Sequence, residues 1–182
     1  MVLARLFRRK PFLREGYELY TAAVTAARDP ALYTVLAAPD TLEGRFDLIC
    51  LHVGLLIRRL RLDADPAGKD LAQAVFDAMF NDMDLNLREM GVGDMGIGKR
   101  VKRMWEAFHG RAKAYEEALE AGDEAALADA LLRNLWGGHE MDPPDAPARL
   151  AARAFALSAV LAGQGMAALK AGQVDFPVME QA

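Results

Sequence analysis

Apolar residues recur along the chain at the three- and four-residue steps of an amphipathic helix. No segment alternates apolar and polar residues over more than a few positions, and β-branched residues are sparse. The most regular stripe consists of Leu42, Phe46, Ile49, Val53, Leu56 and Leu60. A second stripe consists of Leu71, Val75, Met79, Met83 and Leu87. The pattern predicts an all-α fold, a single-domain bundle of about six to seven helices.

Capping residues and helix breakers set the expected helix boundaries. Asp40 and Glu43 have the spacing of a capping box, and Asp29 and Asp65 each precede a proline that suits a first helical turn. The glycine-rich stretch 91–98 is expected to be a loop. The predicted helices cover residues 15–28, 30–36, 41–61, 66–90, 99–120, 124–136 and 146–171. The expected organisation is a basic N-terminal segment at 1–14, a helical domain at 15–172 and a C-terminal tail at 173–182.

The composition is that of a folded protein without disulfides. The 182 residues are 53% hydrophobic and 26% charged, which suits one domain with its own core. Because Cys50 is the only cysteine, an internal disulfide is excluded, and this fits a reducing compartment. Twenty-two Lys and Arg stand against 26 Asp and Glu, and the net charge of −4 argues against a dedicated nucleic-acid binder, DNA included.

Basic residues are concentrated in two islands of an otherwise acidic chain. Residues 1–14 carry five bases and no acid, which fits either a solvated terminus or a short membrane-surface contact. The second island, residues 99–113, begins with Lys99, Arg100, Lys102 and Arg103. These four fall at the expected start of a helix, where cations are electrostatically unfavourable. That cost indicates contact with an acidic partner, a phosphate backbone or an anionic lipid surface, or internal pairing with Asp82, Asp84 or Asp94.

No apolar run is long enough to span a membrane. The longest candidate, residues 46–57, is interrupted by Asp47 and His52 and is shorter than the roughly 18 residues that a span requires. The first 14 residues lack the uninterrupted apolar stretch and the small-residue cleavage site of a secretory signal. The sequence therefore predicts a protein that is not integral to a membrane.

Three patterns that resemble catalytic or cofactor sites lack the context that such sites require. Residues 91–96 match G-x-G-x-x-G, but they follow an amphipathic helix instead of a strand, which excludes a dinucleotide site. Glu106 and His109 have the E-x-x-H spacing of a di-iron helix, yet the chain offers no second copy. Ser158 and Cys50 lie in apolar helical segments and not in a nucleophile elbow. We expect no catalytic residue, no metal site and no cofactor.

Arg45, His52 and Arg59 lie at seven-residue intervals on the helix predicted at 41–61. This spacing places them along one side of the helix, beside its apolar stripe. Cations with apolar neighbours suit a peptide or an amphipathic helix, so the three are candidates for one edge of a binding groove. The alternative is a solvated rim whose side-chain stems cover the core. The pattern alone leaves both interpretations open.

Several motifs between about residues 17 and 136 point to a known family. They are Pro39-Asp40-Thr41, Gly44-Arg45-Phe46-Asp47, Leu51-His52, Arg58-Arg59-Leu60, Phe80 to Asp84, Leu87 to Asp94, Gly98 to Arg103, Phe108 to Arg111 and Tyr115. Together these motifs resemble the ubiquinol-cytochrome c chaperone family. The block from Phe80 to Arg103 is long enough to make the resemblance specific.

The resemblance implies a non-enzymatic assembly factor for the cytochrome b-containing respiratory complex, ubiquinol-cytochrome c reductase. Members of the family bind newly synthesised cytochrome b, and mitochondrial members work near the ribosome exit region with a small accessory protein. The chain starts without a mitochondrial transit segment, so it looks more like an alphaproteobacterial member. We therefore expect a cytoplasmic protein, peripheral at the inner face of the inner membrane, with the anionic membrane surface as a further partner.

These observations combine in one expected client-binding site. A groove beside the helix predicted at 41–61, together with the hairpin from Asp82 to Arg103, is expected to hold a segment of cytochrome b. The expected client-binding residues are Arg45, His52, Arg59, Asp82, Asp84, Arg88, Val92, Asp94, Lys99, Lys102 and Arg103. The alternatives are a peripheral membrane adaptor and a helical quinone- or haem-binding protein that uses His52 or His109.

Overall fold

The chain folds into helices joined by short turns. The computed structural model describes residues 11–139 and 141–178, which contain eight helices and no strand. The helices are α1 (Leu13–Ala27), α2 (Pro30–Thr34), α3 (Leu42–Arg61), α4 (Ala67–Glu89), α5 (Asp94–Ala121), α6 (Glu124–Leu135), α7 (Ala146–Ala162) and α8 (Met166–Lys170). The predicted all-α fold is confirmed for this part of the chain. Residues 1–10, most of the basic N-terminal segment, lie outside the described residues.

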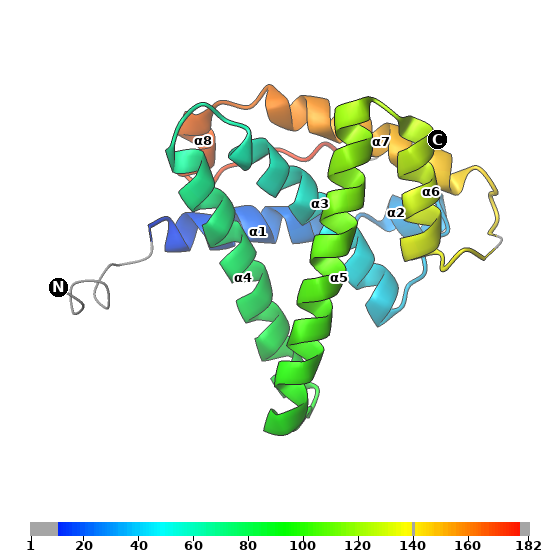
Figure 1. The fold of residues 1–182 in the computed structure, drawn as a ribbon, viewed down its shortest axis with the longest axis horizontal. Helices are drawn as coiled ribbons and strands as arrows, with labels where there is room; N and C mark the ends of the chain where they lie inside the picture. Colours follow the sequence, from blue (N-terminus) through cyan, green and yellow to red (C-terminus); the bar gives the residue numbers. More distant parts are fainter. Residues whose placement is uncertain (1–10, 140, 179–182) are drawn as a thin grey trace.

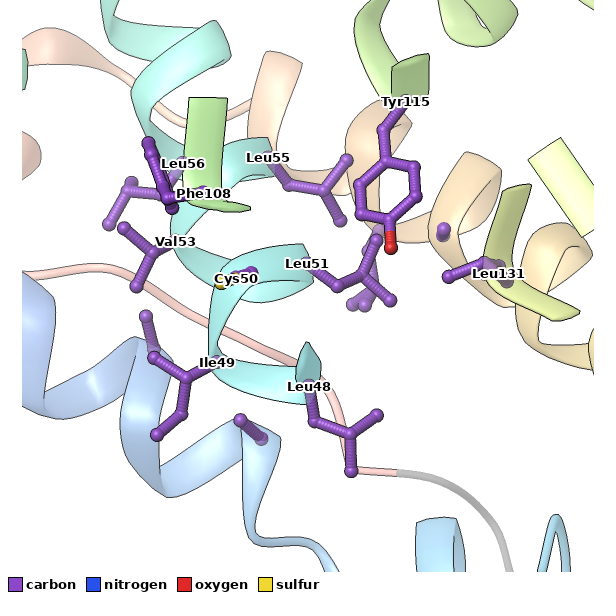
Figure 2. Close-up of a cluster of buried hydrophobic side chains, with 14 of the residues drawn as sticks. Leu48, Ile49, Cys50, Leu51, Val53, Leu55, Leu56, Phe108, Tyr115 and Leu131 are labelled. Atoms are coloured by element: carbon purple, nitrogen blue, oxygen red, sulfur yellow. The ribbon is translucent and has the colours of Figure 1, made fainter. Parts of the chain in front are cut away.

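The core forms around α3, which other helices cover on nearly every side. This helix contacts α1, α4, α5, α6 and α7, and every residue from Asp47 to Val53 is buried. In Figure 2, Leu51 points toward Tyr115 of α5 and Leu131 of α6, whereas Ile49 points toward α1. A helix that is apolar around its circumference belongs in a core. The burial of α3 therefore extends well beyond the single stripe that the sequence predicts.

The remaining helices pack around α3 in two groups. One group is formed by α1 and α4, which contact each other and α3, and the other by α6 and α7. Helix α5 contacts α3, α4 and α6 and so connects the two groups. Helices α4 and α5 form a hairpin whose closed end extends beyond the other helices in Figure 1. We call residues 82–103 the hairpin tip.

Helix α3 is capped by Thr41 and not by the predicted Asp40. The Thr41 Oγ1 accepts a hydrogen bond from the Gly44 N–H at 3.0 Å. Asp40 instead forms an ion pair with Arg45, with 2.6 Å between the carboxylate oxygen and Nε. The predicted capping pattern is therefore displaced by one residue, although the helix begins where the sequence indicates.

The turn between α4 and α5 is shorter than the predicted loop. Gly91 has a φ of 77°, and its N–H donates to the Arg88 carbonyl at 3.0 Å. The Val92 N–H donates to the Leu87 carbonyl at 3.1 Å, which completes a Schellman motif at the end of α4. A left-handed residue of this kind favours glycine, and the chain is ready to start a new helix after Gly93.

Helix α5 starts at Asp94, five residues before the predicted start at Lys99. It continues through Gly96 and Gly98, because a glycine inside a helix costs only about 1 kcal/mol relative to alanine. The prediction that residues 91–98 form a loop is therefore wrong. The basic run from Lys99 to Arg103 lies after the first turn of α5, which removes the electrostatic cost expected from a position at the helix N-terminus.

The last predicted helix, at 146–171, is two helices with a break between them. Helix α7 ends at Ala162, and α8 begins at Met166. The Gly163 N–H is shared between the carbonyls of Ala159 and Val160, at 3.2 Å from each. Such a bifurcated bond is common at helix ends, and a second glycine two residues later interrupts the helix.

Candidate functional site

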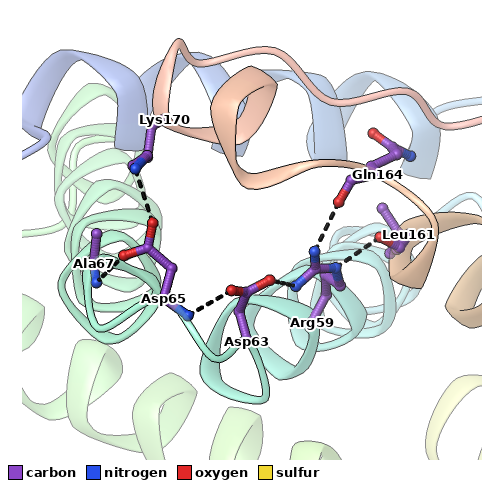
Figure 3. A network of polar contacts seen from close by, with 7 residues as sticks. All are labelled: Arg59, Asp63, Asp65, Ala67, Leu161, Gln164 and Lys170. Carbon is purple, nitrogen blue, oxygen red and sulfur yellow. Dashed lines mark hydrogen bonds and ion pairs between the residues drawn. The ribbon is translucent and has the colours of Figure 1, made fainter.

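Arg59 joins the end of α3 to the break between α7 and α8. Its guanidinium donates to the Asp63 carboxylate at 2.6 Å and to the carbonyls of Leu161 and Gln164 at 2.9 and 2.7 Å (Figure 3). The arginine supplies hydrogen bonds where the helix stops and its carbonyls lose regular partners. Only 12% of the Arg59 side chain is exposed. Arg59 thus stabilises the fold and does not lie on the exposed edge of a binding groove, where the sequence places it.

The same network ties the turn after α3 to α8. The Asp63 carboxylate accepts from the Asp65 N–H at 2.7 Å, and this bond, with Arg59, holds the pKa of the Asp63 carboxyl below its ordinary value. The Asp65 carboxylate, one residue before the Pro66 cap of α4, accepts from the Ala67 N–H at 2.9 Å and from Lys170 Nζ at 2.8 Å. The ion pair with Lys170 is the main cause of a lowered pKa at Asp65. Figure 3 shows both carboxylates within one connected chain of polar contacts.

His52 lies inside the core and is fully buried. Its Nδ1 is 2.8 Å from the Leu48 carbonyl oxygen, so this nitrogen carries the proton and donates it. The Phe176 ring from the C-terminal segment lies against it, with 6.0 Å between ring centroids. Burial lowers the pKa of His52 to about 4. The imidazole has no solvent access in this conformation, so His52 does not lie on the exposed groove edge where the sequence places it, and its role in client binding stays a prediction.

The structure therefore does not bring Arg45, His52 and Arg59 together on one exposed edge. Arg45 is exposed, and its ion pair with Asp40 raises its pKa. The other two are enclosed by α7, α8 and the C-terminal segment. Regular seven-residue spacing marks one side of a helix, but in α3 that side leads from solvent into the core.

A buried ion pair fastens α5 across α3. The Asp47 carboxylate, 5% exposed, lies 2.8 Å from the Arg111 guanidinium, which also stands over the Phe46 ring at 5.9 Å from its centroid. Burial raises the pKa of Asp47 to about 6, even though Arg111 favours the ionised form. The pair joins α3 to α5, and neither residue belongs to the lining of the cavity described below.

Three acids of the hairpin tip, Asp82, Asp84 and Asp94, have partners within the fold. Asp82 accepts a hydrogen bond from the Tyr20 hydroxyl at 2.7 Å. Arg88 bonds to both Asp84 and Asp94, at 2.7 and 2.9 Å, and so links the end of α4 to the start of α5. Five predicted site residues, counting half-buried Val92, thus lie in one small region.

The basic residues of the tip behave differently. Lys99, Arg100, Lys102 and Arg103 are all exposed. Lys102 lies 3.7 Å from Glu106, and none of the four pairs with a carboxylate of Asp82, Asp84 or Asp94 within the described residues. Internal pairing with these acids, one of the explanations considered for the basic run, is therefore excluded in this conformation. The cations stay directed to solvent.

A cavity of about 660 Å³ opens between α3, α4 and α5, on the side where α4 and α5 diverge from the tip. We call it the central groove. Its lining residues are Leu51, Gly54, Leu55, Ile57, Arg58, Arg61, Lys69, Ala72, Gln73, Phe76, Trp105, Phe108, His109, Ala112, Tyr115, Glu116 and Leu119. Its volume falls in the range of sites that enclose a small ligand or a few side chains of a partner.

Aromatic rings form one wall of the central groove. Phe76 of α4 packs against Phe108 of α5, with 5.6 Å between centroids, and Trp105 lies over His109 at 3.9 Å. The His109 Nδ1 is 2.9 Å from the Trp105 carbonyl oxygen. Trp105 is 46% exposed, although its spacing from Phe108, Ala112 and Tyr115 predicts that it faces inward on the helix expected at 99–120. A tryptophan left this open beside apolar neighbours is a common anchor for a binding partner.

The floor of the central groove has an unfilled position at Gly54 of α3. A Cβ placed on this glycine would meet no atom within 4 Å. Cations join the lining from Arg58 and Arg61, which follow Gly54 on the same side of α3, and from Lys69 of α4. Arg61 lies 3.4 Å from Glu116, and the Nε of Arg58 is buried without a hydrogen-bond partner. The groove therefore offers an apolar interior with hydrogen-bond donors at one side.

Sequence reasoning missed this groove, and its lining shares no residue with the eleven expected client-binding residues. A signal was present in Phe76, Trp105 and Phe108, three large aromatics on neighbouring predicted helices. In the described part of the chain, no group of three or more His, Cys, Asp or Glu side chains is placed to hold a metal ion. Nor does that part contain a helix long and apolar enough to cross a membrane.

Comparison with known proteins identifies the family. The model of the ubiquinol-cytochrome c chaperone family matches residues 34–176. Ubiquinol-cytochrome-c reductase complex assembly factor 1 of Xenopus laevis is 27% identical over 125 residues, which cover 69% of this chain and 62% of the frog protein. Mitochondrial protein CBP3 of Saccharomyces cerevisiae is 33% identical over 110 residues, 59% of this chain and 32% of the yeast protein. The chain thus spans less than two thirds of the length of these relatives.

A solved structure agrees with the family match over nearly the whole fold. The crystal structure of the Cbp3 homolog from Brucella abortus is 36% identical in sequence and superimposes with a TM-score of 0.80, covering 97% of each chain. The chain belongs to the ubiquinol-cytochrome c chaperone family.

Proposed function

We propose that this chain is a non-catalytic assembly chaperone that holds a hydrophobic segment of newly synthesised cytochrome b in the central groove. The observation that carries the proposal is the groove itself, an open apolar cavity of about 660 Å³ beside a half-exposed tryptophan. Relatives of the chain are named as assembly factors of ubiquinol-cytochrome c reductase, which supports this class of client.

The chemistry of the groove suits a membrane-protein segment. Its walls combine aliphatic residues of α3 with the rings of Phe76, Trp105 and Phe108. An apolar helix that has not yet found its neighbours gains free energy by burying side chains against such a surface. The cations at Arg58 and Lys69 suit an acidic side chain or a helix carboxyl end flanking the segment.

Photo-crosslinking from the groove tests the contact directly. A photo-reactive amino acid replaces Gln73, an exposed residue of the groove lining, in cells that make cytochrome b. The matched control places the probe at Lys113, an exposed position of α5 outside the groove lining. We expect cytochrome b adducts from position 73 and few from position 113. Equal yields from both positions would contradict a binding site in the groove.

Filling the groove should block the client without disturbing the fold. Gly54→Leu adds a side chain where a Cβ meets no atom, and it replaces a helical glycine with a better helix former. We expect the Gln73 crosslink to fall at least about tenfold, as for the loss of a buried anchor site. Gly54→Ala is the control, because its methyl group leaves most of the groove open.

The two variants separate a blocked groove from a damaged protein. Both should unfold at a urea concentration equal to or above that of the unaltered chain, since each removes a flexible glycine from α3. A Gly54→Leu protein that is stable, yet captures cytochrome b as well as the Gly54→Ala protein, argues that the client binds elsewhere. Haem absorbance in the purified chain would instead favour a cofactor site, for which His109 is the available groove histidine.

A further inference from the structure

The hairpin tip carries a cluster of cations that the fold does not use. Lys99, Arg100 and Arg103 are exposed and have no acidic partner among the described residues, and Lys102 has only the distant contact with Glu106. Steps of one, three and four residues place these bases on one broad side of α5. The buried Ile97 and Phe108 mark the other side, so the cations face away from the bundle.

None of the acids of the tip pairs with these bases among the described residues. Asp84 and Asp94 share Arg88, and the Asp82 carboxylate is engaged by Tyr20 on the side of the tip that faces α1. Apart from Glu106, which follows the bases along α5, the acids of this region, Glu89 included, lie on α4 and its junction with α5, whereas the four bases lie on the outer side of α5. Such a one-sided cationic surface attracts polyanions.

Apolar side chains are exposed on the same projecting element. Leu85 is 55% exposed and Met90 is 54% exposed, on the α4 arm and at its end. Figure 1 shows that the closed end of the hairpin extends past the remaining helices, so a flat surface can reach it without meeting the rest of the fold. A projecting element that carries both exposed apolar residues and unpaired cations has the composition of elements that lie at a membrane interface.

We infer that the hairpin tip docks onto an anionic membrane surface. The bases on the outer side of α5 bind lipid phosphates, and Leu85 and Met90 enter the headgroup region. A nucleic-acid phosphate backbone would satisfy the cations equally well, but it offers nothing to exposed Leu and Met side chains. This combination favours lipid over RNA. The inference does not depend on the central groove, whose lining includes none of these residues.

Vesicle binding by the full chain tests the inference. The probes are vesicles of phosphatidylcholine alone and vesicles of equal parts phosphatidylcholine and phosphatidylglycerol. We expect binding only to the anionic vesicles, with an affinity that falls as salt is added. Lys99→Gln/Arg103→Gln should weaken it about thirtyfold, because each base near such a surface contributes about a factor of five. The control Arg133→Gln/Arg149→Gln removes two exposed bases of α6 and α7 and should change it less than about twofold.

The apolar part of the contact is tested separately. Leu85→Gln/Met90→Gln keeps the charge and should weaken vesicle binding severalfold, whereas the same change at the exposed Leu42 and Leu62 should not. Circular dichroism and urea unfolding confirm that each variant is folded. The inference is overturned if the tip and control variants bind vesicles alike, as they would if residues 1–10 alone held the chain. It is also overturned if a single-stranded RNA binds with the same dependence on Lys99 and Arg103 and vesicles do not.

Discussion

A buried histidine, His52, shows how strongly the fold changes the chemistry of a single side chain. His52 has no access to solvent, and its only polar contact in the described structure is the hydrogen bond from Nδ1 to the Leu48 carbonyl. Protonation would place a charge among apolar side chains with Nε2 lacking an acceptor. Burial therefore lowers the pKa to about 4, and the imidazole is neutral at physiological pH.

This shift predicts a specific loss of stability in acid. The unfolded chain binds a proton at His52 near pH 6.5, but the folded chain binds it only near pH 4, so the stabilising effect is complete above pH 6.5 and declines below it. Between pH 6.5 and 4, the free energy of unfolding should fall by up to about 3 kcal/mol more in the unaltered chain than in His52→Leu. Urea unfolding at a series of pH values measures this difference.

If the free energy of unfolding changed with pH in the same way in both proteins, folded His52 would take up its proton at its ordinary pKa, contrary to the prediction. The buried Asp47 does not mask the result, because its carboxyl is present in both proteins. Its raised pKa, about 6, acts in the opposite direction, since stability from this group declines as pH rises through that value. The comparison between variants isolates the histidine, whereas the profile of one protein alone does not.

For a single residue, the sequence predicts exposure and pKa only where residues nearby in the chain form its whole environment. The spacing of Arg45, His52 and Arg59 correctly identifies one side of a helix, but their exposure depends on α7, α8 and the C-terminal segment. Those elements lie about 100 residues further along the chain. No pattern within α3 indicates that these elements pack against it. The three residues therefore look equivalent in the sequence but differ in exposure in the structure.

Helices, in contrast, are largely predictable from local periodicity. The stripes of α3 and α4 give their extents to within a few residues, because three- and four-residue spacing is a property of the segment itself. Errors occur at glycines, which both end helices and lie inside them. Gly91 ends α4 in a left-handed conformation, while Gly98 belongs to the regular helix α5, and the sequence does not distinguish these two roles.

Alanine substitution distinguishes the two glycines experimentally. Gly91→Ala should lower the free energy of unfolding by about 1 kcal/mol, since a φ of 77° is unfavourable for a residue with a Cβ. Gly98→Ala should raise it by about 0.5 to 1 kcal/mol, because α5 gains a better helix former and the new Cβ meets no atom within 4 Å. Urea unfolding measures both. If both substitutions changed the free energy of unfolding in the same direction, one of the two glycines would not have the backbone conformation described for it.

The candidate site belongs to the scale of the whole molecule. The central groove exists because α4 and α5 diverge from the tip while α3 closes the floor, so its lining comes from three helices. Periodicity predicts that Trp105 faces inward with its helix, and only the separation of α4 and α5 leaves it half exposed. The family resemblance indicates the function class from motifs, but motif positions do not report a cavity. The bases of the hairpin tip, in contrast, are predicted as site residues because the basic run is visible in the sequence itself.

Long-range contacts join the C-terminal helices to α3, and Arg59 makes two of the hydrogen bonds involved. Arg59→Met removes hydrogen bonds to two carbonyls of the α7–α8 break and leaves Asp63 without its arginine partner. We expect the free energy of unfolding to fall by about 2 to 4 kcal/mol, the usual cost of unpairing a largely buried charge network. Hydrogen exchange should rise at α8 in particular, because Lys170 and Asp65 then form its remaining ion pair to the α3–α4 turn.

The matched control is Arg45→Met, which breaks an ion pair with the same 2.6 Å separation on the same helix. Both partners of that pair are more than half exposed, so water replaces the lost contact and the free energy of unfolding should barely change. If the two substitutions lowered the free energy of unfolding equally, the burial of Arg59 at the α7–α8 break would add nothing to stability. A large loss at Arg59 alone would show that this arginine, although it was expected to bind a client, serves to join the C-terminal helices to the core.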